Sequence, residues 1–314
     1  MTDITTIGEI MIDLTQTGYN ENKIPLFAAH PGGAPANVAV AASRLGARTA
    51  CIGKVGGDGF GDYLRRMLEE NKVDTSNVRS GGATTMAIVS VDNSGERSFQ
   101  FVRGADCELT PEDVDEELLQ GSRVLHFGSV SLTRGVARSA TIFAARSAKN
   151  AGAVISYDPN YRPALWRSEK DALEWMVLPL SLVDIIKLSD DELPLLTGTS
   201  ELEEGSRRLE EAGISLIMIT LGSKGVFCRW KGQCVTIPGV SVKVADTNGA
   251  GDTFLGAVLS RLCRRDGKPL EGLEMDELKD ILGYANRAAS FTCSRSGAIS
   301  AMPDLKEMEE HTAV

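Results

Sequence analysis

The residues best placed to do chemistry lie in one short stretch, residues 246–256, which reads DTNGAGDTFLG. It follows an alternating apolar segment at 240–245 and leads into a run whose apolar residues recur at helical spacing. The glycines are therefore expected where a strand hands over to a helix. The free N–H groups and the dipole of a helix start form an anion site there. Gly249 and Gly251 carry no side chain that would keep an anion away from these amides.

Asp252 stands inside this predicted anion site, in the first turn of the helix. One interpretation is a general base that takes a hydroxyl proton while the amides hold a transferring phosphoryl group. The other is that Asp252 only stabilises the helix dipole, as acidic first-turn residues often do. From this stretch alone, the two interpretations carry equal weight.

A second glycine-rich helix start lies at residues 31–37, which read PGGAPAN. Gly32 and Gly33 again allow close approach to the backbone. Asn37, one turn into the helix, offers both a donor and an acceptor, which suits sugar hydroxyls. Two glycines before a helix are also ordinary turn chemistry, so this pattern alone does not establish a site.

Other phosphate-binding patterns are missing from the chain. Residues 56–61 read GGDGFG, but the third glycine of a dinucleotide fingerprint would fall on Asp62, and Asp58 is assigned to turn chemistry. The P-loop pattern GxxxxGK[ST] does not occur. These observations disfavour a nicotinamide-dependent oxidoreductase, and they predict that any nucleotide is held without a P-loop.

Composition narrows the functional class further. The 314 residues carry a formal net charge of −10, which argues against a nucleic-acid or anionic-membrane partner. No apolar run reaches spanning length and the N-terminus lacks a signal-peptide pattern, so a cytoplasmic location is expected. The six cysteines form no CxxC pair, and the three histidines are scattered, so neither a disulfide framework nor a zinc site is predicted.

Strand and helix patterns alternate along the whole chain, which predicts one α/β domain over residues 1–314 with a doubly wound, mostly parallel sheet. The first strand is expected over residues 3–14. A hairpin over 84–92 and 97–103, joined by a turn at 93–96, is expected to leave the main sheet as a small flap.

In such sheets the ligand lies beyond the carboxyl ends of the strands. Several polar or glycine-rich positions are expected at such ends, although they are far apart in the sequence: Asp13, residues 158–162, Lys187, Gly222 and residues 249–252. A lone aspartate such as Asp13 is more often a surface residue. The convergence of so many positions favours the general-base interpretation of Asp252 over the dipole interpretation.

Taken together, these motifs resemble the ribokinase-like (PfkB) sugar kinases, which phosphorylate sugars and nucleosides with ATP. Two signatures carry the resemblance: GGAPANVAVAASRLG (32–46) with GKVGGDGFG (53–61), and DTNGAGDTFLGA (246–257). The similarity covers essentially the whole chain. Within the family, the segments GEIMID, HFGSVSL, DPNYRPALW and KLSDDE are most similar to fructokinases.

The resemblance implies roles for individual residues. Asp252 matches the base, with an anion hole formed by Gly249, Ala250 and Gly251. Sugar-contacting positions are matched by Asp13, Gly32, Gly33, Asn37 and Arg162. Nucleotide-site positions are matched by Lys187, Thr220, Gly222, Gly225 and Asn286. The resemblance also implies a lid formed by residues 11–30 and 84–104, which in many members pairs two subunits into a homodimer.

Two departures from the family pattern concern the ions. The nucleotide-side motif Asn-x-x-Glu appears here as Lys187-Leu-Ser-Asp190, and Asp190 is one methylene shorter than the glutamate that the family uses toward Mg²⁺-bound waters. Asn248 stands beside Asp246 where a threonine is usual, in the segment that the resemblance implies binds a monovalent cation. ATP, Mg²⁺ and K⁺ are the expected cofactors.

The function expected from these features is that of a fructokinase, which converts ATP and D-fructose into ADP and D-fructose 6-phosphate. The alternatives within the family are a ribokinase, a 2-keto-3-deoxygluconate kinase and an aminoimidazole riboside kinase. A catalytically silent sugar or nucleotide sensor on the same fold is a further alternative, which the intact GAGD sequence disfavours.

Overall fold

A ten-stranded, mostly parallel sheet forms the centre of the molecule in the computed structural model, which describes residues 1–91 and 97–310. The strand order is β14-β13-β12-β11-β10-β9-β1-β4-β5, and β6 pairs with β4 beside this path. Among the described residues of this sheet, the β12–β13 and β13–β14 pairings are antiparallel and the other pairings are parallel. The strands are β1 (Thr2–Ile7), β4 (Thr49–Val55), β5 (Val73–Asp74), β6 (Val78–Ser80), β9 (Ser122–Gly128), β10 (Val154–Asp158), β11 (Ile185–Ser189), β12 (Leu216–Thr220), β13 (Val226–Trp230) and β14 (Gln233–Ile237).

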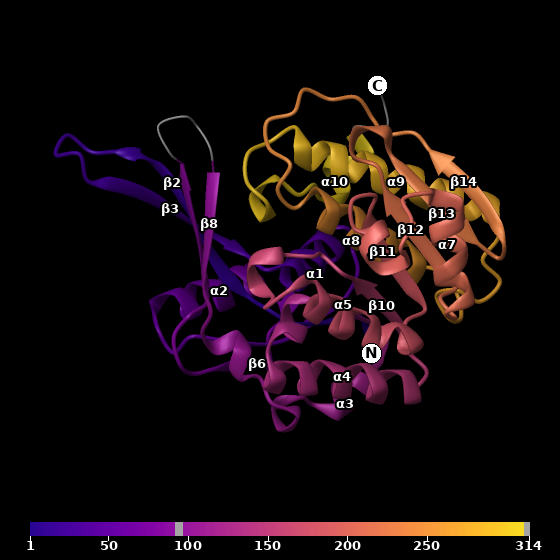
Figure 1. Ribbon diagram of the computed structural model, residues 1–314, viewed down its shortest axis with the longest axis horizontal. Helices are drawn as coiled ribbons and strands as arrows, with labels where there is room; N and C mark the ends of the chain where they lie inside the picture. The colour runs from indigo at the N-terminus through magenta and orange to yellow at the C-terminus, as the bar shows by residue number, and fades with distance from the viewer. Residues whose placement is uncertain (92–96, 311–314) are drawn as a thin grey trace.

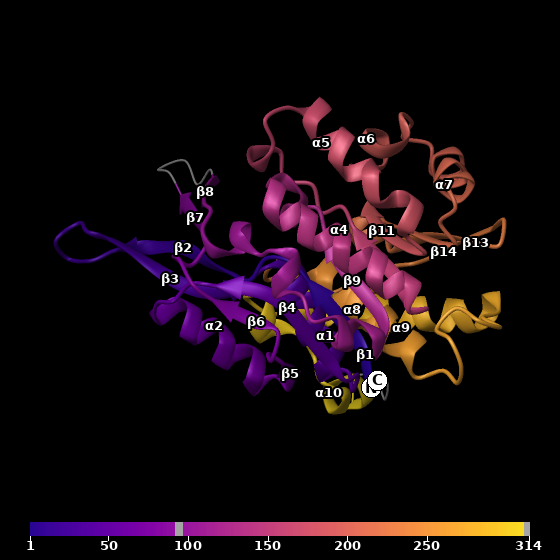
Figure 2. The same cartoon turned by 90° about the horizontal axis from the view of Figure 1, so that it is seen from below.

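Helices cover both faces of this sheet, as the alternation of elements predicts (Figures 1 and 2). Figure 2 shows α4 and α5 on one side of the sheet, and α1, α2 and α10 on the other. The α-helices are α1 (Ala34–Arg44), α2 (Gly59–Glu70), α3 (Glu116–Gln120), α4 (Gly135–Asn150), α5 (Glu169–Val177), α6 (Leu193–Thr197), α7 (Leu202–Glu211), α8 (Ala250–Cys263), α9 (Met275–Cys293) and α10 (Leu305–Glu310).

The two faces of the sheet are filled by alternating residues of the same strands. On one face, Ile4 and Val124 join Leu255 of α8 in a buried apolar cluster. On the other face, Leu125 of the same strand β9 packs in a cluster with Ala144 of α4. Because successive side chains of a strand point to opposite faces, each buried strand contributes to both layers. No helix in the described ranges is long and apolar enough to cross a membrane.

A separate four-stranded sheet in the order β3-β2-β7-β8 stands outside these layers. Its strands are β2 (Met11–Tyr19), β3 (Pro25–Gly32), β7 (Met86–Val91) and β8 (Arg97–Val102). Figure 1 shows β2, β3 and β8 projecting away from the helix-covered sheet. A small β sheet beside the main one is therefore confirmed. The predicted turn at 93–96 lies outside the described residues.

The first strand is interrupted, contrary to the expectation of one strand over residues 3–14. β1 belongs to the main sheet and β2 to the small one, and Gly8 lies between them with a φ of 151°. A Cβ at this position would lie 2.7 Å from the ring of Pro35. The chain therefore changes sheets at a residue where only glycine fits well, and this change places Asp13 in the small sheet.

Candidate active site

The start of α8 is an uncapped helix N-terminus. Gly249 is the N-cap residue with a φ of 74°, and no side chain caps the first turn. In the described part of the chain, the amides of Gly251 and Asp252 have no acceptor, whereas the Ala250 amide donates to the Thr247 carbonyl over 3.3 Å. The amides of Gly251 and Asp252 are thus available to an anion, and the Ala250 amide makes only a long hydrogen bond.

The segment before α8 is not the strand that its alternating pattern predicts. Residues 238–245 form no regular structure, and Val240 and Val244 are exposed. The alternation therefore reflects a chain crossing the surface rather than a ladder in the sheet. The helix start itself lies where the sequence predicts it.

Lys187 brings a positive charge to the same helix start from β11. A Cβ on Gly251 would lie 2.9 Å from the Lys187 Nζ, so the glycine makes room for the ammonium group. Nζ also donates to the Asp158 Oδ2 over 2.9 Å, in a buried ion pair. Burial opposes the charge on Lys187, but the carboxylates of Asp158 and Glu192 outweigh it and raise the pKa of the lysine. Lys187 is therefore positively charged beside the free amides of α8.

Asp252 and Asn37 join the two glycine-rich helix starts. The Asn37 Nδ2 donates to the Asp252 Oδ2 over 2.8 Å, across 215 positions of sequence. The Asn37 Oδ1 is buried and has no hydrogen-bond partner among the described residues. A buried acceptor without a donor is costly, so this oxygen is suited to a ligand hydroxyl.

Burial raises the pKa of Asp252 to about 6, against the hydrogen bond from Asn37. The nearby charge of Asp158 raises the pKa further, whereas Lys187 and Arg162 lower it. A carboxylate with this pKa is ionised at neutral pH, yet it is a better proton acceptor than an ordinary aspartate. The position and the pKa both suit a general base.

Asp13 is the second partly buried carboxylate of the region. Burial raises its pKa to about 6; His30 and Arg162 lower it, and the charge of Asp252 raises it. His30 lies opposite Asp13 on β3. A Cβ on Gly32 would lie 2.5 Å from the Asp13 Oδ2, so the missing side chain at Gly32 leaves room for the Asp13 carboxylate. The positive charge of Arg162, an exposed residue after β10, lowers the pKa of both Asp13 and Asp252.

Glu9, which the sequence did not single out, supports the start of α1. Its Oε1 accepts the Ala34 amide over 3.1 Å, and a Cβ on Gly33 would clash with the Glu9 carbonyl. Burial raises the pKa of Glu9 to about 7. The only sequence signal is an acidic residue inside an apolar run, and spacing does not reveal its partner 25 positions away.

Glu192, which the sequence offered only as the last residue of the segment KLSDDE and without a role of its own, fixes the loop that carries Arg162. Its Oε1 accepts the Tyr161 amide over 2.6 Å, and its Oε2 accepts the Ser189 amide over 2.8 Å. The carboxylate thereby ties the loop after β10 to the end of β11. The predicted nucleotide-side carboxylate, Asp190, is exposed near the same strand end, where its amide donates to the Thr220 carbonyl over 3.1 Å.

The other predicted nucleotide-site residues gather around the ends of β12 and β14. Thr220 ends β12, and Gly222 and Gly225 flank the following turn with φ values of 58° and 102°. A Cβ on Gly225 would clash with the Ile237 carbonyl. The Asn286 Nδ2 donates to the carbonyls of Ile237 and Pro238 over 3.2 and 2.9 Å. Asn286 therefore holds the chain where it leaves β14, a positioning role.

Asp246 joins two loops near the α8 start. Its Oδ1 accepts the Asn248 amide over 3.1 Å, and its Oδ2 accepts the Gly297 amide over 3.1 Å. These contacts hold the loop before α8 against the loop after α9 and place one carboxylate between them, and carboxylate oxygens are ligands that hard cations prefer. Within the described residues, no three His, Cys, Asp or Glu side chains gather into a metal cage.

The arrangement can deprotonate a hydroxyl group and stabilise an anion at adjacent points. Asp252 offers the basic oxygen, the Gly251 and Asp252 amides offer donors, and Lys187 adds positive charge. Asp13 and the Asn37 Oδ1 offer acceptors for further hydroxyls. This combination fits transfer of an anionic group to a polyhydroxylated acceptor.

The raised pKa values predict an acid limb in the activity. Asp13 and Asp252 both have pKa values of about 6 and act as ionised groups, so activity should be lost as the pH falls through about 6. Below pH 6 we expect the logarithm of kcat/KM for the hydroxylated substrate to fall with a slope between one and two. Initial rates between pH 5 and pH 8 measure this profile. A profile that stays flat down to pH 5 would contradict the assignment of both carboxylates.

Comparison with known proteins adds independent information. The model of the pfkB family carbohydrate kinases matches residues 1–305. The chain is 39% identical over 309 residues to a probable fructokinase-2 of Arabidopsis thaliana, covering 96% of this chain and 92% of the relative.

Two solved structures are similar over the whole length. The fructokinase of Xylella fastidiosa with bound ATP shares 29% of its sequence, with a TM-score of 0.92 and complete coverage of both chains. A double mutant of the fructokinase of Vibrio cholerae O395, with bound fructose, ADP and a potassium ion, is 29% identical in sequence to this chain. It has a TM-score of 0.87 and coverage of 99% and 98%. The predicted fold class is thereby confirmed.

Proposed function

The chain belongs to the pfkB family of carbohydrate kinases, and from that premise we propose that it is a fructokinase, which transfers the γ-phosphoryl group of ATP to the 6-hydroxyl of D-fructose. One observation carries the proposal most directly. The carboxylate of Asp252, with a pKa of about 6, lies in the first turn of an uncapped helix and accepts a hydrogen bond from the Asn37 Nδ2. The Asn37 Oδ1 has no hydrogen-bond partner among the described residues. The similarity to named fructokinases supports the choice of sugar.

On the sugar side, hydroxyl groups of fructose would donate to the Asp13 carboxylate and to the Asn37 Oδ1. These acceptors lie on β2 and α1, so the small sheet and the main domain hold the substrate together. Charge-assisted hydrogen bonds fix its orientation better than neutral ones. The 6-hydroxyl is then within reach of the Asp252 carboxylate, which takes its proton as the oxygen attacks the γ-phosphorus.

On the phosphate side, the free amides of Gly251 and Asp252 and the Lys187 ammonium would stabilise the negative charge of the transferring group. A preorganised helix start needs little rearrangement during the reaction, which is why such donors are effective in catalysis. The bond from the γ-phosphorus to the bridging oxygen breaks, and ADP leaves with that oxygen. The loops after β12 and β14, held by Asn286, would accommodate the nucleotide.

The ions expected from the sequence fit the residues present. Because the described side chains form no metal cage, Mg²⁺ would arrive on the phosphates of ATP, with Asp190 nearby, and would neutralise phosphate charge. K⁺ would lie beside the Asp246 carboxylate, in the segment that also carries Asn248.

We therefore expect an absolute requirement for Mg²⁺ and a several-fold higher rate in K⁺ than in Na⁺ at equal ionic strength. ADP release with each chloride salt measures both effects. Equal rates in K⁺ and Na⁺ would show that the asparagine at position 248 has removed the cation preference, and activity in EDTA would contradict the Mg²⁺ role.

A homodimer through the small sheet is part of the proposal. Several large apolar side chains of the β2–β3 hairpin are exposed: Tyr19, Ile24, Leu26 and Phe27. Exposed apolar side chains grouped on one element favour a protein interface. Light scattering should give a dimer for the natural chain and a monomer for a Leu26→Glu, Phe27→Glu variant. A monomeric natural chain at micromolar concentration would contradict this part of the proposal.

Identification of the product tests the proposed reaction. After incubation with ATP, Mg²⁺ and D-fructose, ³¹P NMR should show fructose 6-phosphate formed in equal amount to ADP. Fructose 1-phosphate as the main product would place a different hydroxyl beside Asp252. Release of inorganic phosphate without any sugar phosphate would show that the protein hydrolyses ATP and does not phosphorylate fructose, which would contradict the proposal.

A further inference from the structure

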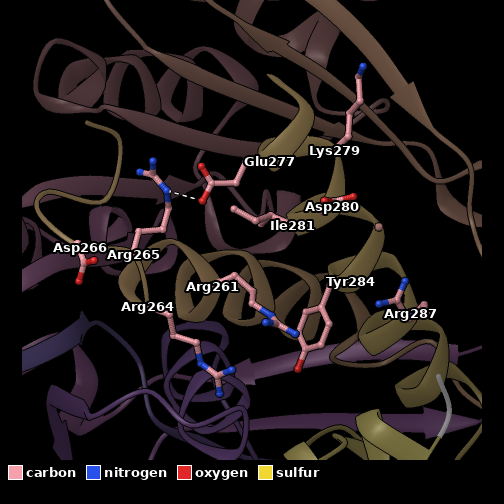
Figure 3. A pocket seen from close by; sticks show the side chains of 11 residues that line it. Arg261, Arg264, Arg265, Asp266, Glu277, Lys279, Asp280, Ile281, Tyr284 and Arg287 are labelled. Carbon is pink, nitrogen blue, oxygen red and sulfur yellow. Dashed lines mark hydrogen bonds and ion pairs between the residues drawn. The ribbon is translucent and has the colours of Figure 1, made fainter. Parts of the chain in front are cut away.

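A cavity of about 790 Å³ lies away from the candidate active site, between α8 and α9 (Figure 3). Its volume is within the range of about 300–1,000 Å³ that is usual for small-molecule sites. Five basic and three acidic side chains line it. In a chain with a net charge of −10, such a local excess of basic groups calls for an explanation.

Part of the basic lining is engaged in the fold. The Arg265 Nε donates to the Glu277 Oε1 over 2.7 Å, as the dashed line in Figure 3 marks. The Arg264 Nη2 donates to the Leu45 carbonyl over 2.9 Å, where it ties α8 to the end of α1. These two arginines therefore have structural partners.

In the described ranges of the chain, Arg261 and Arg287 have no such partners. Neither forms an ion pair with a carboxylate in the part of the chain that the structure describes. Their guanidinium groups lie over the ring of the same residue, Tyr284, with 3.8 and 5.8 Å from the Cζ atoms to the ring centroid. Figure 3 shows them on either side of this tyrosine. Both guanidinium groups therefore bring positive charge to the surroundings of one tyrosine.

Three buried polar atoms at this point also lack partners. They are the Nε atoms of Arg261 and Arg287 and the hydroxyl of Tyr284, none of which meets hydrogen-bond geometry with a described residue. The Tyr284 hydroxyl does interact with the Arg261 guanidinium, which lowers the pKa of the tyrosine against the larger effect of burial. Tyr284 itself is only 6% exposed. Leaving buried polar atoms unsatisfied is costly, and these three belong to residues that line one cavity.

The helix dipole explains only one of these residues. Arg261 lies in the last turn of α8, where a cation is favourable. Arg287 lies in the interior of α9, where the dipole offers no such stabilisation. Stacking on the tyrosine ring stabilises each guanidinium, but it leaves both Nε–H groups without an acceptor.

We propose that this cavity binds a small phosphorylated metabolite, as a second anion site of the protein. Guanidinium groups match the oxygens of a phosphate in planar, paired hydrogen bonds, and the Tyr284 hydroxyl adds a third donor. The volume has room for an organic group as well as the phosphate. Asp266 and Asp280 also line the cavity and would repel an extended polyanion such as RNA.

The second site is separate from the reacting atoms. Arg261 lies nine positions after Asp252 on α8, or about 13 Å along the helix axis. A bound metabolite would therefore contact the same helix that presents Asp252, without touching the fructose or the phosphoryl group.

Calorimetry with glucose 6-phosphate as the probe tests the proposal. The full chain is first saturated with ADP, Mg²⁺ and fructose, so that the active site is occupied. We expect one equivalent of glucose 6-phosphate to bind, and neutral glucose not to bind. The variant Arg261→Gln, Arg287→Gln should bind at least about 100-fold more weakly, about tenfold for each charge-assisted contact.

Two further variants keep the test decisive if that double variant does not fold. Tyr284→Phe removes only a hydroxyl group and should weaken binding several-fold. Arg207→Gln removes an arginine that pairs with Glu204 and Glu211 on α7, and it should bind as the natural chain does. Unchanged affinity in the Tyr284 and Arg261/Arg287 variants, or no binding by the natural chain, would overturn the proposal. Because these substitutions lie away from Asp252, Asp13 and Asn37, loss of glucose 6-phosphate binding in them is distinguishable from a failure of the proposed fructokinase reaction.

Discussion

Replacing Asp252 by asparagine should lower kcat by about two to four orders of magnitude. Asparagine keeps the size of the side chain and an oxygen that can accept from the Asn37 Nδ2, but it cannot take a proton from the sugar hydroxyl. The KM for ATP should change little, because the amides of the α8 start are unaltered. Single-turnover rates with radiolabelled ATP separate the chemical step from nucleotide binding.

The stability of the same variant provides its control. The pKa of Asp252 is higher in the fold than the value of 3.8 that describes the unfolded chain, so ionisation destabilises the fold as the pH rises through about 6. Removing the charge should leave the Tm at pH 8 unchanged or raise it. The free energy of unfolding should rise by at most about 3 kcal/mol. If the folded variant kept more than a tenth of the natural kcat, Asp252 would not be the base.

Replacing Asp13 by alanine should have the second-largest effect, on the sugar side. A buried carboxylate can accept hydrogen bonds from two sugar hydroxyls, each worth about 1.5–3 kcal/mol when charge-assisted. We expect kcat/KM for fructose to fall by at least about tenfold per bond, with little change in the KM for ATP. Initial rates with each substrate varied in turn measure both quantities.

Asp58 offers a matched control for Asp13. Its Oδ1 accepts the Gly61 amide over 2.9 Å at the start of α2, and its Oδ2 accepts the Thr84 amide over 2.8 Å. These contacts agree with its assignment to turn chemistry. Asp58→Ala should therefore lower the free energy of unfolding by about 0.5–2 kcal/mol, as loss of a helix cap does, and should alter fructose kcat/KM much less than Asp13→Ala. Equal losses of kcat/KM would show that the sugar pocket is wrongly placed.

The sequence predicted the parts of the site that depend on residues close to one another in the chain. The helix start at Gly249 was predictable because a left-handed N-cap requires glycine, and Gly251 because a close approach to the backbone requires it too. The first-turn position of Asp252 follows from these two glycines. The alternation of strands and helices also predicted which segments end at the same edge of the sheet.

The features that the sequence could not predict depend on contacts between distant segments. The break between β1 and β2 depends on Pro35 lying against Gly8, and the contact of Lys187 with Gly251 depends on how β11 lies beside α8. The apolar alternation at 240–245 suggested a strand, yet this segment has no neighbouring strand to pair with among the described residues. Period-two patterns describe side chains and do not supply a hydrogen-bonding partner.

Choice of sugar is the central claim, and a coupled ADP-release assay over a panel of acceptors tests it most directly. The panel should contain D-fructose, D-ribose, 2-keto-3-deoxygluconate and aminoimidazole riboside, each with ATP, Mg²⁺ and K⁺. We expect kcat/KM for D-fructose to exceed that for every other acceptor by at least about tenfold, which corresponds to about 1.4 kcal/mol or one net hydrogen bond in the pocket. A higher kcat/KM for another member of the panel, or ADP release with fructose no faster than without any sugar, would contradict the assignment.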